Sequence, residues 1–223
     1  IYKNMKIKSW FNYSALMFVK LLKYGIYPIK EQWIGRKADW DRVHLIIILN
    51  HTSLFEFLYG SVLPNNFLKK CAKNLVVPVA DTTLKKPFIG RLLKCLIPEV
   101  APLTRKRDSS WREFCQQLNP DKMLIIMPEG RMKRTTGLDK EGMKMKCRTG
   151  IADIIEVFKG RQMLLVYSPG LHHVCPPGKL LPRPFKQLSV KLQAFDVGDF
   201  IAECTSDQGE IDSVFMAGLL DKL

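Results

Sequence analysis

A histidine and a glutamate follow directly after the most apolar run of the chain. Residues 46–49 are all aliphatic, His51 comes two positions later, and Glu56 lies five positions after the histidine. A neutral imidazole can take a proton from a hydroxyl group at neutral pH. A carboxylate on the other ring nitrogen would select the tautomer and stabilise the imidazolium. The pair therefore predicts a general base, His51, that is oriented by Glu56.

The spacing of this pair constrains the backbone around it. Side chains five residues apart on one continuous helix diverge by about 140°, so His51 must lie in a loop with a helix beginning just after it. Ser53 is a suitable N-cap for that helix. A capping box is the alternative interpretation, in which Glu56 only reaches back to the amide at the helix start. The two roles can coexist.

A second apolar run, residues 124–127, ends in a turn that is rich in cations. Pro128 ends the strand because it lacks a backbone donor, Glu129 follows, and Gly130 permits a tight turn. Three cations come next: Arg131, Lys133 and Arg134. Guanidinium groups bind phosphate oxygens bidentately, so this turn is a candidate phosphate site. A solvated basic loop is the alternative. A further basic stretch, residues 105–107, follows another apolar segment and includes Arg105.

The order of apolar and amphipathic segments predicts the elements that would position these residues. Short aliphatic runs suit strands covered on both faces, and in such sheets the functional groups lie beyond the carboxyl ends of the strands. We expect strands at 45–49, 76–80, 100–103, 123–127 and 163–167, an edge strand at 188–192, and helices at 53–59, 84–96, 109–118, 151–158 and 210–220. This alternation predicts an α/β fold: one domain with a mostly parallel, mixed central sheet flanked by helices.

The first 31 residues are expected to form an amphipathic helical arm, with residues 32–223 as the main domain. Residues 10–24 are apolar and aromatic, with lysines around them. Such a helix can lie in a membrane interface, or it can be a first helix that packs on the domain's own core. No run approaches the ~20 apolar residues that span a bilayer, so a peripheral association is expected.

Composition indicates a globular domain with an uneven charge. The chain has 223 residues, 47% of them hydrophobic, and a net charge of +14. Residues 196–223 hold seven acids and one base, so residues 1–195 carry 34 bases and 14 acids. A polycation of this kind favours an anionic surface. Nucleic acid would explain only the charge, because the aromatic and basic signatures of known nucleic-acid modules are missing from the sequence.

The cysteines and paired histidines do not predict a metal site. Six cysteines are scattered without a C-x-x-C pair, which argues against zinc and suits a reducing cytoplasm. His172, His173 and Cys175 lie close together in a proline-rich segment. Adjacent histidines in such a loop are more often structural or exposed than metal ligands.

Taken in order, these motifs resemble the four blocks of the glycerolipid acyltransferase family, whose best-known members are the 1-acylglycerol-3-phosphate (lysophosphatidic acid) acyltransferases. The resemblance covers residues 45–170 and is carried by Asn50-His51-x4-Glu56, Pro87-Phe88-x-Gly90 with Arg105, Pro128-Glu129-Gly130-Arg131, and Pro169 after an apolar strand. Residues 146–152 resemble the basic-Gly-Ala helix start that follows the third block. The chain departs from the family in three places: Glu56 stands where Asp is usual, Arg131 follows Gly130 directly where Thr-Arg is usual, and the spacing from Gly90 to Arg105 is slightly long.

The resemblance implies acyl transfer from an acyl thioester, either acyl-CoA or acyl-carrier protein, to the hydroxyl of a lysophospholipid such as 1-acylglycerol-3-phosphate. The acceptor's hydroxyl would lie against His51, and Glu129 would organise the third-block turn or bind the acceptor's glycerol. Its phosphate would be held by members of the set Arg105, Arg131 and Arg134. No further cofactor or metal is implied. The enzyme would act at the cytoplasmic face of a membrane. A non-catalytic module that binds anionic lipid is the alternative, but it leaves the His51–Glu56 pair unexplained.

Overall fold

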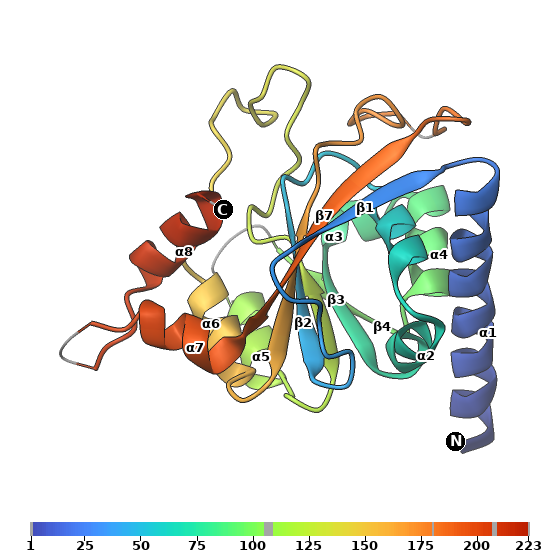
Figure 1. The fold of residues 1–223 in the computed structure, drawn as a ribbon. Helices are drawn as coiled ribbons and strands as arrows, with labels where there is room; N and C mark the ends of the chain where they lie inside the picture. The colour runs from blue at the N-terminus through green and yellow to red at the C-terminus, as the bar shows by residue number, and fades with distance from the viewer. Residues whose placement is uncertain (1, 105–108, 180, 207–208, 223) are drawn as a thin grey trace.

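A single sheet runs through the centre of the molecule (Figure 1). The structure is a computed structural model, and it describes residues 2–104, 109–179, 181–206 and 209–222. Within these residues the sheet has seven strands: β1 (Ile29–Ile34), β2 (Val43–Leu49), β3 (Leu75–Ala80), β4 (Glu99–Leu103), β5 (Met123–Ile126), β6 (Gln162–Tyr167) and β7 (Leu188–Asp196).

The strand order is β1-β7-β6-β2-β5-β3-β4. Every neighbouring pair is parallel except β6 and β7, which are antiparallel. The predicted mostly parallel, mixed sheet is therefore confirmed. The prediction that residues 188–192 form an edge strand is wrong, because β1 pairs with β7 and takes the edge position itself. Residues 29–31, which the sequence assigned to the arm, thus belong to the sheet.

Helices cover both faces of the sheet, as Figure 1 shows. On one face lie α1 (Tyr2–Leu21), α2 (Asn65–Asn74) and α4 (Pro87–Leu96), together with the 3-10 helix η2 (Glu56–Val62). On the other lie α5 (Ser109–Gln116), α6 (Ile151–Val157), α7 (Val197–Glu203) and α8 (Ser213–Lys222). Two short elements complete the described helices: η1 (Leu22–Tyr24) and α3 (Asp81–Leu84).

Strand β2 contributes alternate side chains to the two halves of the core. Ile46 and Ile48 pack in the cluster formed with α1, α2 and α4, whereas Leu45, Ile47 and Leu49 pack in the cluster formed with α5 to α8. All five are at most 6% exposed. Because both faces of the strand are covered, both sets of positions are apolar, and the sequence is a continuous aliphatic run rather than an alternating one.

Helix α1 packs on the domain through one of its sides. Val19 is buried in the core beside α2 and η2, and the Asn12 side chain donates a hydrogen bond to the carbonyl of Cys95 at 2.8 Å. Lys20 Nζ donates to the carbonyl of Leu63 at 2.7 Å. These bonds tie the helix to η2 and α4, so one of the two expectations for this segment, packing on the core, holds for this side.

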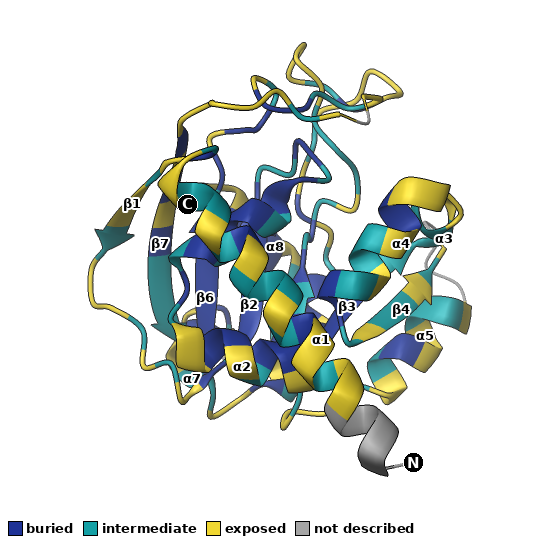
Figure 2. Ribbon diagram, turned by 90° about the vertical axis from the view of Figure 1, so that its right-hand side faces the viewer, coloured by how far each residue is buried: buried dark blue, intermediate teal, exposed yellow. Residues whose placement is uncertain are grey.

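The opposite side of α1 faces away from the domain and is apolar. Figure 2 shows exposed positions along the outer surface of the helix, with the buried strands behind it. The exposed apolar residues there are Ile7, Trp10, Phe11, Phe18 and Leu21. Among the described residues, no helix is both long enough and apolar enough to cross a bilayer.

Candidate active site

Three loops meet beyond the carboxyl ends of central strands of the sheet and form the site. Strands β5 and β6 are both parallel neighbours of β2, so the carboxyl ends of these three strands lie side by side. The chain leaves β2 sharply at Asn50, whose φ of 62° lies in the left-handed region that Asn tolerates better than most residues. The turn places the next residue, His51, beyond the carboxyl end of β2, in the loop where the sequence predicted it.

The predicted contact between His51 and Glu56 is formed. His51 Nδ1 lies 2.5 Å from Glu56 Oε2, and Glu56 is 2% exposed. The other carboxylate oxygen, Oε1, accepts hydrogen bonds from the amides of Thr52 at 2.7 Å and Ser53 at 3.3 Å. An ionised carboxylate only accepts hydrogen bonds, so Nδ1 is the donor and, in the neutral imidazole, Nε2 keeps its lone pair. Glu56 therefore orients the histidine and also binds the backbone amides, as in the capping-box interpretation.

The predicted helix start at Ser53 is wrong. The helical segment begins at Glu56 and is a 3-10 helix, η2, with no side-chain cap at its start. Ser53 Oγ instead donates a hydrogen bond to the carbonyl of Cys175, at 2.8 Å. Residues 51–55 between β2 and η2 are not helical, and in this loop Glu56 reaches both the imidazole and the amides of Thr52 and Ser53.

Glu129 connects the loop after β5 to the catalytic loop. Its two carboxylate oxygens accept hydrogen bonds from the amides of Asn50 at 2.9 Å and His51 at 2.7 Å. The amide of Lys133 returns a bond to the carbonyl of His51 at 2.8 Å. The backbone of His51 is thus held from both sides by the turn that begins at Pro128. Both oxygens of Glu129 accept hydrogen bonds from the protein itself, which fits the first of its two expected roles, organisation of the third-block turn rather than binding of the acceptor's glycerol.

The loop after β6 supports the same segment from the other side. Asn50 Nδ2 donates a hydrogen bond to the carbonyl of Ser168 at 2.7 Å, and Thr52 Oγ1 accepts one from the amide of Leu171 at 2.7 Å. His172 Nε2 donates to the carbonyl of Lys133 at 2.7 Å, which joins this loop to the turn after β5. His172 therefore has a structural partner. In the described part of the chain no group of three or more His, Cys, Asp or Glu side chains is arranged to hold a metal.

The surroundings of His51 favour its protonated form. Burial alone would lower the pKa of the imidazole, but the charge and hydrogen bond of Glu56, together with the charge of Glu129, outweigh it and raise the pKa above 6.5. Burial raises the pKa of Glu129, although the hydrogen bonds that it accepts from the amides of His51 and Asn50 oppose the shift. The pair can therefore take up a proton and stabilise the resulting imidazolium, which is what general-base catalysis requires.

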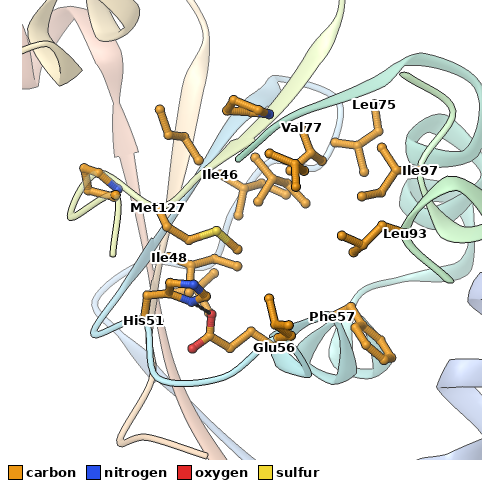
Figure 3. Close-up of a pocket in the computed structure, with 18 of the residues that line it drawn as sticks. Ile46, Ile48, His51, Glu56, Phe57, Leu75, Val77, Leu93, Ile97 and Met127 are labelled. Carbon is orange, nitrogen blue, oxygen red and sulfur yellow. Dashed lines mark hydrogen bonds and ion pairs between the residues drawn. The ribbon is translucent and has the colours of Figure 1, made fainter. Parts of the chain in front are cut away.

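An apolar cavity of about 660 Å³ opens beside this pair. His51 and Glu56 lie at one end of it and Leu75, Leu93 and Ile97 at the other (Figure 3). The walls between them come from β2, β3 and β5 on the sheet side and from η2, α2 and α4 on the helix side. They include Ile46, Ile48, Phe57, Leu68, Val77, Ile125 and Met127. Such a cavity suits a long apolar group whose reacting end lies at the histidine.

The three arginines predicted to bind phosphate do not all lie at the cavity. Arg131 lines the cavity, and its Nη1 donates to Asp139 Oδ2 at 2.5 Å and also to Glu141. Arg134 is exposed and is not among the residues that line the cavity. Arg105 lies outside the described residues. Gly130 also lines the cavity, at a φ of 66° that explains the glycine at this turn.

One cation at the cavity was not assigned a binding role from the sequence. Arg148 lines the cavity together with Thr104 and Trp111. Residues 146–152 were recognised only as a helix start, and indeed α6 begins at Ile151. Spacing alone could not associate Arg148 with His51, because the two are far apart in sequence and come together only through the turn after β5.

The fold and the site are those expected of an enzyme of acyl transfer, and comparisons with known proteins show the family. A sequence model of the Acyltransferase family matches residues 36–166, more than half of the chain. The chain therefore belongs to the Acyltransferase family, and the resemblance found in its motifs is confirmed. A comparison with curated protein sequences finds no match.

A solved structure has the same fold. It is the 1-acyl-sn-glycerophosphate (LPA) acyltransferase PlsC from Thermotoga maritima, with a TM-score of 0.51 and 15% sequence identity. The match covers 98% of this chain and 77% of that one. At this identity the similarity concerns the fold. The family match supports acyl transfer as the activity of this chain.

Proposed function

We propose that this chain transfers a fatty acyl group from an acyl thioester to the hydroxyl of a lysophospholipid, with 1-acylglycerol-3-phosphate as the preferred acceptor. The observation that carries the proposal is the hydrogen-bonded His51–Glu56 pair at the end of a 660 Å³ apolar cavity. Acylation of a lipid hydroxyl needs a base at the end of an apolar cavity that can hold an acyl chain.

The chemistry requires His51 and no enzyme nucleophile. Nε2 takes the proton of the acceptor hydroxyl as its oxygen forms a bond to the thioester carbon. Glu56 stabilises the imidazolium that results, because its carboxylate accepts the Nδ1 hydrogen bond. The tetrahedral oxyanion then collapses, the carbon–sulfur bond breaks, and the thiolate recovers the proton from His51. The products are the diacylated lipid and the free thiol.

The apolar cavity is proposed to hold the acyl chain. Its volume lies within the range of sites that enclose small ligands, about 300–1,000 Å³, and the walls along its length are aliphatic or aromatic. A chain that enters from the His51 end would bring its thioester carbon to the base. Either acyl-CoA or acyl-carrier protein is compatible with this geometry as the donor.

The acceptor's phosphate is proposed to bind on the side of the cavity that Arg131 and Arg148 line. Guanidinium is suited to the bidentate recognition of phosphate. Arg105 and Arg134 remain proposed contributors; the Arg134 side chain would have to move toward the cavity to take part.

The outer side of α1 is proposed to contact the membrane that holds the lipid substrate. Trp10 is 71% and Phe18 64% exposed, although both are large and apolar. Aromatic groups of this kind insert at the headgroup boundary, and the positive charge of residues 1–195 favours an anionic leaflet. This predicts peripheral association with the cytoplasmic face.

Lipid mass spectrometry can test the proposal directly. Purified protein is incubated with acyl-CoA or acyl-carrier-protein thioesters and a panel of lysophospholipids. We expect a diacyl product, with lysophosphatidic acid as the best acceptor. The His51→Ala variant should lose about 10²–10⁴-fold in rate, whereas the matched control His173→Ala, an exposed residue, should not. Product from neither donor, or full activity of folded His51→Ala, would refute the proposal.

A further inference from the structure

The charge of Arg131 is already shared with two carboxylates. Its Nη1 donates to Asp139 and Glu141, and these hydrogen bonds raise the pKa of the guanidinium. Asp139 is 5% exposed and is held in place by the amides of Glu141 at 2.8 Å and Met143 at 2.9 Å. One cation therefore faces two anions. A phosphate that approached Arg131 would have to compete with both carboxylates and would be repelled by their surplus charge.

Arg148, which precedes α6, packs against the turn that contains Arg131, on the side of Gly130. Its amide donates a hydrogen bond to the carbonyl of Pro128 at 3.1 Å. Its side chain passes so close to Gly130 that a Cβ on this glycine would lie 3.1 Å from the arginine Nε. The absence of a side chain at position 130 thus makes room for the guanidinium on the turn.

This position is connected to the catalytic base by a short series of contacts. Gly130 follows Glu129, whose carboxylate accepts the amide of His51 at 2.7 Å. Both Arg148 and His51 line the same cavity, and Arg148 is exposed to solvent. A headgroup next to a hydroxyl that reacts at His51 would therefore lie beside Arg148.

We propose that Arg148 is a specificity-determining residue that binds the phosphate of the acceptor, while Arg131 mainly holds the segment containing Asp139 and Glu141 against the turn. The inference rests on the proposed acyl-transfer function and deepens it. It explains how a chain whose third block lacks the usual Thr-Arg pair can still recognise a phosphate monoester. The phosphate contact comes from the helix start that follows the block, instead of from the block itself.

The test compares Arg148→Ala with Arg148→Lys, Arg131→Ala and a matched surface control, Arg36→Ala, whose side chain is exposed in the turn between β1 and β2. Two quantities are measured with a short-chain, monomeric lysophosphatidic acid: its KM in acyl transfer and its Kd by calorimetry. The same acyl-acceptor without phosphate, a monoacylglycerol, gives the preference for the phosphate group. Thermal melting checks that each variant is folded.

We expect Arg148→Ala to raise the KM and Kd of lysophosphatidic acid about tenfold to a hundredfold, the usual effect of one lost charge-assisted contact. The donor's KM and the turnover of monoacylglycerol should remain nearly unchanged. Arg148→Lys should recover part of the loss, because lysine keeps the charge without the bidentate geometry. Arg131→Ala should lower the melting temperature, and it should change the phosphate preference less than Arg148→Ala does.

An unchanged Kd and phosphate preference in folded Arg148→Ala would overturn the inference and leave the acyl-transfer proposal intact. If wild-type protein binds lysophosphatidic acid but forms no product, the proposed function fails, and the Kd comparison still decides the role of Arg148. If Arg148→Ala does not fold, Arg148→Gln, which keeps most of the side chain, takes its place in the same measurements.

Discussion

Replacing Glu56 by glutamine tests whether this carboxylate orients the catalytic base or only organises the loop. Both carboxylate oxygens are in use, one toward His51 and the other toward the amides of Thr52 and Ser53. Glutamine has nearly the same shape but only one acceptor oxygen. It cannot satisfy both sets of donors at once, so its two possible orientations have different consequences.

In the first orientation the glutamine oxygen accepts the two backbone amides and its NH2 group points at His51. Nδ1 must then act as an acceptor, which moves the imidazole proton to Nε2 and removes the base. In the second orientation the oxygen faces Nδ1, and the NH2 group faces the amides of Thr52 and Ser53. Both residues are 1% exposed, and an unsatisfied buried donor costs about 1–3 kcal/mol. The first orientation should therefore predominate.

We expect Glu56→Gln to lower kcat by about 10²–10⁴-fold. Loss of a general base costs a rate factor in this range, and a wrong tautomer of the base costs a factor near its upper end. The assay follows thiol release from acyl-CoA at saturating acceptor. Circular dichroism verifies that the fold is retained. The double variant His51→Ala/Glu56→Gln should be little slower than His51→Ala, because both changes remove the same base.

A Glu56→Gln protein that keeps most of its turnover would refute this reasoning and leave Glu56 as a loop-organising residue alone. A double variant that shows the full product of both single effects would also contradict it, because the two residues would then act independently.

Three further predictions concern pH, the turn after β5 and the membrane. Because the pKa of His51 is raised above 6.5, kcat/KM should rise with pH along an acidic limb above that value, and the limb should move to lower pH in Glu56→Gln; an unmoved limb would assign it to another group. The same shift means that the His51–Glu56 pair stabilises the fold fully below about pH 6.5 and that this contribution is lost as pH rises through the raised pKa. Glu129→Gln should lose at least one of the two amide bonds that hold the catalytic loop, lowering kcat and the melting temperature together, by about 1–3 kcal/mol in stability; a stability unchanged within error would contradict this. Trp10→Ser/Phe18→Ser should weaken sedimentation with anionic vesicles, while high salt alone should release the wild-type protein only in part; equal binding of variant and wild type would exclude the outer side of α1.

Local patterns in the sequence were enough to predict the contact between His51 and Glu56 and the central strand. The aliphatic run that ends at His51 predicted β2 because a strand buried on both faces must be apolar at every position. The His51–Glu56 spacing predicted a loop between the two residues, since a continuous helix would have turned their side chains apart. Both conclusions depend on the geometry of a few consecutive residues, which is why the sequence alone sufficed.

The location of the strand at 188–192 depended on a distant segment. Its alternating pattern was read as an edge strand, but β1, formed by residues 29–34, pairs with it and takes the edge. Strand pairing joins segments far apart in the chain, and the sequence of either strand does not reveal its partner. The side of α1 that packs on the domain was undetermined for the same reason, because it depends on α2, η2 and α4.

The apolar cavity beside His51 was decided almost entirely by tertiary structure. The cavity is built from strands and helices that come from much of the chain, so no local motif predicts it. The cations divide in a way that spacing could not predict: Arg131 is held by Asp139 and Glu141, whereas Arg148 lies on Gly130 beside the catalytic loop. The sequence by itself determined which groups could perform the chemistry, because that depends on residue type and short spacing. Which cations line the cavity, and which of them are paired with carboxylates, was decided by tertiary contacts, because an ion pair forms between whichever side chains the fold brings together.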